Sequence, residues 1–125
     1  MTRSGRRLRI AQVAPPAERV PPYAYGGTER VVDALVHELV GRGHEVTTFA
    51  SADSDVPGRL VATVPKALRS AGFDGDQSPY FVSAALEVVR RQSEFDVVHS
   101  HLEWMSLLLA RALTVPTVST FHGRV

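Results

Sequence analysis

The sequence has 125 residues, of which 44% are hydrophobic and 22% charged, and its formal net charge is +1. This length suits one domain with a real core, and the near-neutral charge gives no reason to expect a nucleic-acid partner. The sequence has no cysteine, which excludes disulfides, thiol nucleophiles and cysteine-ligated metals. No apolar run reaches the roughly 18 residues of a membrane span, so the expected location is the cytoplasm.

The N-terminus carries the one local excess of charge, which consists of Arg3, Arg6, Arg7 and Arg9. Two interpretations are open, a nucleic-acid arm and a solvated leader before the first strand, and the second is favoured. The first expected strand covers residues 8–14, a short and mostly apolar segment that two prolines end. A long loop over residues 15–27 follows, and long ordered loops are often functional.

From Thr28 the hydrophobic pattern takes on the period of an amphipathic helix. Thr28 is the expected N-cap residue, and Gly43 is the expected residue just past the helix C-terminus. The apolar stripe of this helix consists of Val31, Val32, Leu35, Val36, Leu39 and Val40.

Two glycines, Gly26 and Gly27, stand between the first strand and this helix. A glycine pair lets the backbone approach a bound group closely, and a helix N-terminus offers free N–H groups and the positive end of its dipole. Gly26, Gly27 and Thr28 therefore form a candidate anion site, with phosphate as the first candidate. Glu29 complements the helix dipole or takes part in the site. The pattern matches neither the G-x-G-x-x-G nor the P-loop motif, and a glycine-rich turn without a ligand stays an open alternative.

The rest of the chain alternates between strand and helix patterns. Strands are expected at residues 45–50, 59–64, 95–101 and 115–121, and helices at residues 80–92 and 103–113. This order predicts an open α/β fold with a mostly parallel sheet and helices on both faces. Ligands of such sheets bind beyond the carboxyl ends of the strands.

Three candidates converge on that edge of the sheet, namely the glycine pair, His101 and His122. An imidazole of His101 or His122 could donate a hydrogen bond to a substrate hydroxyl or a developing charge. With His99 they could also form a three-histidine metal site, although His99 lies inside its strand and is more simply a half-buried strand histidine. Trp104 is interpreted as helix-packing core rather than as a sugar platform.

With these residues in view, the chain resembles the amino-terminal domain of family 4 glycosyltransferases, which are retaining enzymes with the GT-B fold. Four stretches carry the resemblance and occur in the order typical of the family. They are YGGTERVV at residues 25–32, GHEVTTFA at 43–50, FDVVHSH at 95–101 and PTVSTFHG at 116–123.

The resemblance implies two Rossmann-like domains that face each other across a cleft, and a nucleotide-sugar donor held mainly by the carboxyl-terminal domain. It implies that the Gly26–Gly27 loop approaches the donor diphosphate and the acceptor, that His122 lies near the transferred sugar, and that His101 lines the acceptor side. It also implies transfer with retention and without a metal or other cofactor. The donor sugar, its nucleotide and the acceptor are not specified.

The donor-binding domain has no counterpart in the sequence, so we expect residues 1–125 to form one truncated amino-terminal domain that needs a separate carboxyl-terminal partner and is inactive alone. A different hypothesis is a non-catalytic phosphate- or sugar-binding module, or an inactive relic of the enzyme. A small histidine–metal hydrolase is a third.

Overall fold

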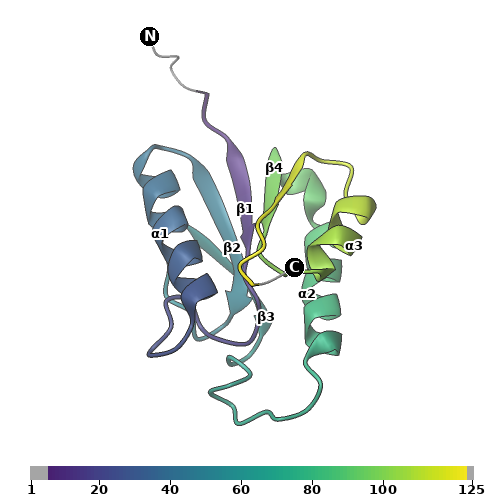
Figure 1. Cartoon of the computed structure of the whole chain (residues 1–125). Coiled ribbons are helices and arrows are strands. Elements are labelled where there is room, and N and C mark those ends of the chain that lie inside the picture. The colour runs from purple at the N-terminus through teal and green to yellow at the C-terminus, as the bar shows by residue number, and fades with distance from the viewer. Residues whose placement is uncertain (1–5, 124–125) are drawn as a thin grey trace.

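The computed structural model describes residues 6–123, which form one sheet with helices on both faces (Figure 1). Every strand pair in the described sheet is parallel, and the strand order is β3-β2-β1-β4-β5. This arrangement confirms the predicted open α/β fold. The elements are β1 (Arg9–Val13), α1 (Gly27–Gly41), β2 (Glu45–Ser51), β3 (Arg59–Val64), α2 (Ser78–Arg90), the 3₁₀ turn η1 (Gln92–Glu94), β4 (Val97–Ser100), α3 (Met105–Ala112) and β5 (Thr117–Ser119).

Helix α1 has a C-terminus that the sequence predicts and an N-terminus that it does not. The N–H groups of Gly43 and His44 donate to the carbonyls of Val40 and Leu39, and Gly43 has a φ of 93°. These bonds form a Schellman motif, which confirms Gly43 as the residue past the helix end. The N-cap residue is Gly26, not Thr28, so the expected cap was wrong. The helix begins earlier because Gly26 supplies a φ of 147° that a side chain would oppose.

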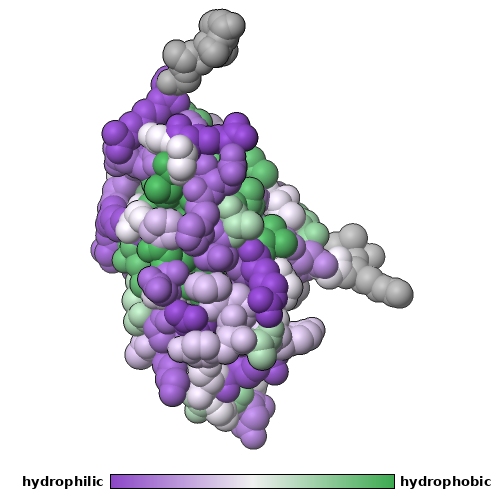
Figure 2. Space-filling model, turned by 90° about the vertical axis from the view of Figure 1, so that its left-hand side faces the viewer, coloured by the Kyte–Doolittle hydropathy of each residue, from purple (hydrophilic) through white to green (hydrophobic). Residues whose placement is uncertain are grey.

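The two faces of the sheet have separate cores. Val32 and Val36 of α1 pack on one face with Val20 and Val46. Figure 1 shows α1 as the one helix on that side of the described sheet. The outer surface of this side is largely hydrophilic with scattered apolar patches (Figure 2). Helices α2 and α3 cover the other face. The core there consists of Ala11, Val13, Phe49, Val61, Ala85, Val88, Phe95, Val98, Leu102, Met105, Leu109 and Leu113.

Helix α3 and the tryptophan directly before it expose several large apolar side chains. Trp104, Leu107 and Leu108 are all more than half exposed, so the interpretation of Trp104 as core is wrong. Only Met105, Ser106 and Leu109 of this helix are buried. The helix starts at Met105 rather than at residue 103, because Glu103 has a φ of 53° that no α-helix contains.

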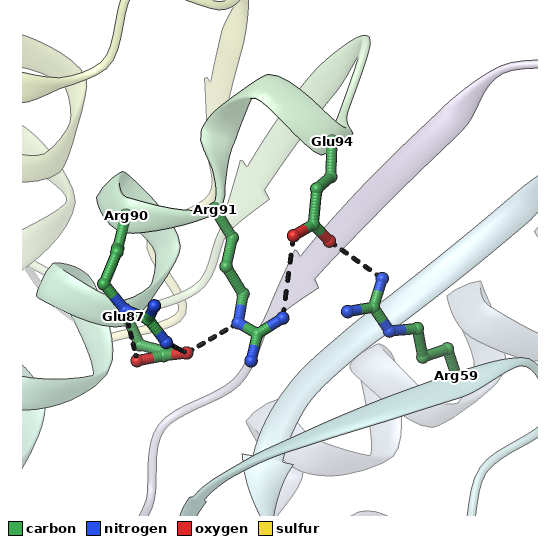
Figure 3. A network of polar contacts seen from close by, with 5 residues as sticks. All are labelled: Arg59, Glu87, Arg90, Arg91 and Glu94. Carbon is green, nitrogen blue, oxygen red and sulfur yellow. Dashed lines mark hydrogen bonds and ion pairs between the residues drawn. The ribbon is translucent and has the colours of Figure 1, made fainter.

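Helix α2 begins at Ser78, two residues before the expected start, because Pro79 fits the first turn of a helix. Its C-terminus joins an ion-pair network that reaches β3 (Figure 3). Glu87 contacts Arg90 and Arg91, Arg91 also contacts Glu94, and Glu94 binds Arg59 at the start of β3. The atoms that pair Arg59 with Glu94 are 2.8 Å apart. All of these side chains keep contact with solvent, with exposed fractions from 25% to 67%, so each pair contributes at most about 1 kcal/mol.

The N-terminal arginines only partly behave as a solvated leader. Arg9 belongs to β1, where its N–H and guanidinium both bind the carboxylate of Asp96, and Arg7 lies 3.7 Å from Glu45. This pairing with Arg9 holds the pKa of Asp96 at about 2. Arg3 lies outside the described residues. None of the helices in residues 6–123 is long and apolar enough to cross a membrane.

Candidate functional site

A hollow of about 500 Å³ lies at the carboxyl-terminal edge of the sheet. The hollow lies between the start of α1 and the segment after β5. Its lining consists of Tyr25, Gly27, Thr28, Glu103, His122 and Gly123. Three residues singled out in the sequence, Gly27, Thr28 and His122, therefore line one hollow. Gly26, Glu29 and His101 are buried nearby and do not line it.

The proline-rich loop that carries Gly26 is anchored to the connection between β2 and β3. The N–H of Val20 donates to Oγ of Ser54 at 2.9 Å, and the N–H of Asp55 donates to the carbonyl of Val20 at 2.8 Å. Arg19 adds a bond of 2.8 Å to the carbonyl of Asp53. These contacts fix the loop in front of the N-terminus of α1. The guanidinium of Arg30 in α1 donates to the carbonyl of Ala24 in the same loop.

The two glycines have different surroundings. A Cβ on Gly26 would lie 2.9 Å from Oε1 of Glu29 and 2.9 Å from Cβ of Pro22, so the packing of the loop requires glycine there. A Cβ on Gly27 would meet nothing within 4 Å. Gly27 is therefore the glycine whose backbone is open to a bound group. The need for Gly26 follows from internal packing and its positive φ.

Glu29 is buried, with 4% of its surface exposed, although it belongs to the first turn of α1. Burial raises the pKa of its carboxyl to about 7, and the nearby negative charge of Glu18 adds to this rise. Desolvation thus outweighs the stabilisation that the helix N-terminus gives to a negative charge. The Glu29 carboxyl packs against Gly26 inside the protein, whereas Gly27 and Thr28 line the hollow.

The histidines form a continuous chain of hydrogen bonds with Gln12 of β1. Gln12 contacts Nδ1 of His99 through Nε2 at 3.1 Å and Nε2 of His101 through Oε1 at 2.7 Å. The chain continues at both ends: Nε2 of His99 lies 2.7 Å from Oγ1 of Thr120, and Nδ1 of His101 lies 2.9 Å from Nε2 of His122. The parallel register of β1 and β4 makes this possible, because it places Gln12 directly beside His99.

Burial decides the charge of the inner histidines. His101 is fully buried, and desolvation together with the neighbouring imidazoles lowers its pKa to about 3. Desolvation also lowers the pKa of His99, which is half-buried as the sequence predicts. His101 is thus neutral near pH 7, and its bond to His122, which is partly exposed, is its connection to the hollow. Within residues 6–123, no group of three or more His, Cys, Asp or Glu is placed to hold a metal ion.

Glu103 is a site residue that the sequence did not reveal. Its Oε1 accepts the N–H of His122 at 2.9 Å, and its Oε2 accepts the N–H of Gly123 at 3.2 Å. It adopts a φ of 53°, which is uncommon for a residue with a side chain and concentrates at functional sites. Glu103 therefore holds the segment that carries His122. A glutamate in the loop after a strand carries no signal of this role.

The comparisons with known proteins agree with this architecture. The model of the family described as Glycosyltransferase Family 4 matches residues 25–125. The chain is similar to the crystal structure of AviGT4, a glycosyltransferase involved in avilamycin A biosynthesis, with 25% sequence identity and a TM-score of 0.55. The match covers 93% of this chain and 32% of that chain, so the chain spans about a third of the length of AviGT4. No curated protein matches the sequence significantly.

Proposed function

The chain belongs to glycosyltransferase family 4, and on that premise we propose that it is the acceptor-side part of an enzyme that transfers a sugar from a nucleotide-sugar donor to an acceptor, with retention of configuration. The family match confirms the resemblance drawn from the sequence, and the structural match to AviGT4 confirms the GT-B-like fold. The reaction, its donor and its stereochemistry are the proposal.

One observation carries the proposal: the N-terminus of α1 and His122 line the same hollow. The free N–H groups at the start of α1 and the positive end of its dipole suit a diphosphate, and the open backbone at Gly27 allows a close approach. His122 lies across from them and can reach a sugar hydroxyl. A nucleotide sugar carries both chemical groups, a diphosphate next to a polyhydroxylated ring.

The buried residues take supporting roles in this proposal. His101 orients His122 through their hydrogen bond, while Gly26 and Glu29 shape the loop that presents Gly27 and Thr28. No metal is included, because both ring nitrogens of His99 and of His101 are already bonded to protein partners. The donor enters as a substrate and not as a resident cofactor.

A second domain completes the proposed enzyme. The chain matches a third of AviGT4, and the hollow around His122 has an open side on which another domain can close. We place the main donor-binding surface on that partner, either elsewhere in a longer polypeptide or in a separate chain. The acceptor then occupies the side near Tyr25, which is 75% exposed.

The test is a transfer assay on the chain alone and on the chain joined to a carboxyl-terminal domain of family 4. Release of nucleoside diphosphate from a panel of nucleotide sugars reports turnover, and the NMR coupling of the anomeric proton of the product reports retention. Turnover that needs the second domain and falls at least about tenfold in His122→Ala supports the proposal. His37→Ala is the matched control, because His37 is exposed on α1 and does not line the hollow.

Two results would contradict the proposal. Equal turnover in wild type and His122→Ala would remove His122 from the reaction. Thermal stabilisation of the chain by sugar phosphates, without turnover in any pairing, would instead identify the non-catalytic binding module.

A further inference from the structure

The hydrogen bonds between Gln12 and the histidines have a direction that the side-chain amide determines. An amide nitrogen only donates and an amide oxygen only accepts. The structure places Nε2 of Gln12 against Nδ1 of His99 and Oε1 of Gln12 against Nε2 of His101. Nδ1 of His99 therefore accepts, and Nε2 of His101 donates.

A neutral imidazole has one donor nitrogen and one acceptor nitrogen, so each bond fixes the next one along the chain. His101 is neutral because burial lowers its pKa to about 3. Since its Nε2 carries the hydrogen, its Nδ1 has a free lone pair and must accept. The partner of that lone pair is Nε2 of His122, 2.9 Å away, which must therefore donate.

This requirement leaves His122 with a defined chemical character. Its Nε2 hydrogen points to His101, so in the neutral ring Nδ1 is the acceptor nitrogen. Nδ1 of His122 has no hydrogen-bond partner among the described side chains and backbone groups. His122 lines the hollow, whereas His101 and Gln12 are buried behind it.

We propose that Gln12 is a positioning residue that sets the tautomers of His99 and His101 and, through His101, makes Nδ1 of His122 a hydrogen-bond acceptor for a hydroxyl group bound in the hollow. If the amide were turned over, every bond in the chain would reverse and His122 would present an Nδ1–H donor instead. A single buried amide, 1% exposed, thus selects between two opposite kinds of contact at the site.

The tautomers follow from protein contacts alone. Only the assignment of the bound hydroxyl to a sugar or to its acceptor rests on the proposed function. The inference can therefore fail while sugar transfer stands, and the transfer assay can fail while the tautomers stand.

The test is NMR of the ¹⁵N-labelled 125-residue chain, with long-range correlations between ring nitrogens and ring carbon-bound protons. At about pH 8, above the ordinary histidine pKa of about 6.5, the spectra report the tautomer of each neutral ring. We expect Nε2–H tautomers for His99, His101 and His122, each with a pyridine-type shift at Nδ1. A pyridine-type shift at Nε2 of His101 or His122 would overturn the proposal.

Two variants test whether Gln12 is the cause. Gln12→Leu removes the acceptor for His101, so we expect the nitrogen shifts of His101 and His122 to move toward values averaged over both tautomers. Thr120→Val is the matched control: it removes the other end of the chain of bonds, and His101 and His122 should keep their wild-type shifts. Unchanged shifts of His101 and His122 in Gln12→Leu would refute the causal role. If leucine prevents folding, Gln12→Met has nearly the length of glutamine without its amide, and the same outcomes apply.

Discussion

Nδ1 of His101 lies 2.9 Å from Nε2 of His122, so the residue directly after β4 and a residue beyond β5 share a hydrogen bond at one edge of the sheet. Their rings stack, with centroids 5.2 Å apart and planes inclined by 26°. One member of the pair is fully buried and the other borders the hollow. The accessible imidazole is therefore held in place by a buried one.

His101→Phe should destabilise the protein by about 1–3 kcal/mol, because it keeps a planar ring but leaves Oε1 of Gln12 buried without a donor. Urea denaturation followed by circular dichroism measures this free energy of unfolding. His37→Phe is the control, since His37 is exposed on α1 and should change stability by less than about 0.5 kcal/mol. Equal small effects of both substitutions would show that the buried histidine chain does not stabilise the fold.

Gly26→Ala and Gly27→Ala, one residue apart, should differ sharply. Alanine at position 26 faces a φ of 147° and two atoms at 2.9 Å, so we expect a loss of about 1–3 kcal/mol in the free energy of unfolding. Alanine at position 27 meets nothing within 4 Å and should leave stability unchanged within about 0.5 kcal/mol. Thermal unfolding of both variants is the measurement, and equal melting temperatures would contradict the structural role of Gly26.

The sequence predicts the order of elements well because each helix and strand has its own hydrophobic period. The ends of an element depend on single residues, and for α1 the predicted C-terminus is correct whereas the predicted N-terminus is not. Gly43 is a local signal that worked, since a helix end with a left-handed residue favours glycine whatever surrounds it. The predicted start of α1 was wrong because the conformation of Gly26 depends on its packing against Pro22, which no local sequence pattern encodes.

Residues of the candidate site could be predicted only where a residue type suited to ligand contact also follows a strand at the carboxyl-terminal edge of the sheet. His122, Gly27 and Thr28 were identified because they follow strands whose carboxyl ends meet. Gln12 was not, because one partner lies on β4 and the other directly after it, 87 positions away for His99 and 89 for His101. That contact depends on the pairing of β1 with β4, and an isolated glutamine in an apolar strand does not reveal it.

Glu29 should make the protein less stable as the pH rises from about 4.5 to about 7. The unfolded carboxyl ionises near 4.5, whereas burial in the folded protein raises its pKa to about 7. The folded state therefore holds a proton that the unfolded state has lost, and stability falls across this window by about 3 kcal/mol before levelling off.

Glu29→Gln should remove that loss, so the variant should gain most over wild type above pH 7 and little at pH 4. His101 has the opposite effect over an overlapping range, because its pKa is lowered to about 3 and stability from it rises with pH. Only the difference between variant and wild type, measured by denaturation at each pH, isolates Glu29. A difference that does not vary with pH would contradict the raised pKa.

Strand β5 should make the 125-residue chain self-associate. Among the described residues, β5 pairs with β4 on one side only, and Val118 on this strand is 51% exposed. Unpaired backbone groups beside an exposed apolar residue favour pairing with another strand. Val118→Lys should weaken self-association at least about tenfold, or about 1.4 kcal/mol, as measured by sedimentation velocity over a range of concentrations. Val31→Lys on α1, where Val31 is 42% exposed, is the control and should leave association unchanged. A wild-type chain that stays monomeric at every concentration would mean that this edge is protected without a partner.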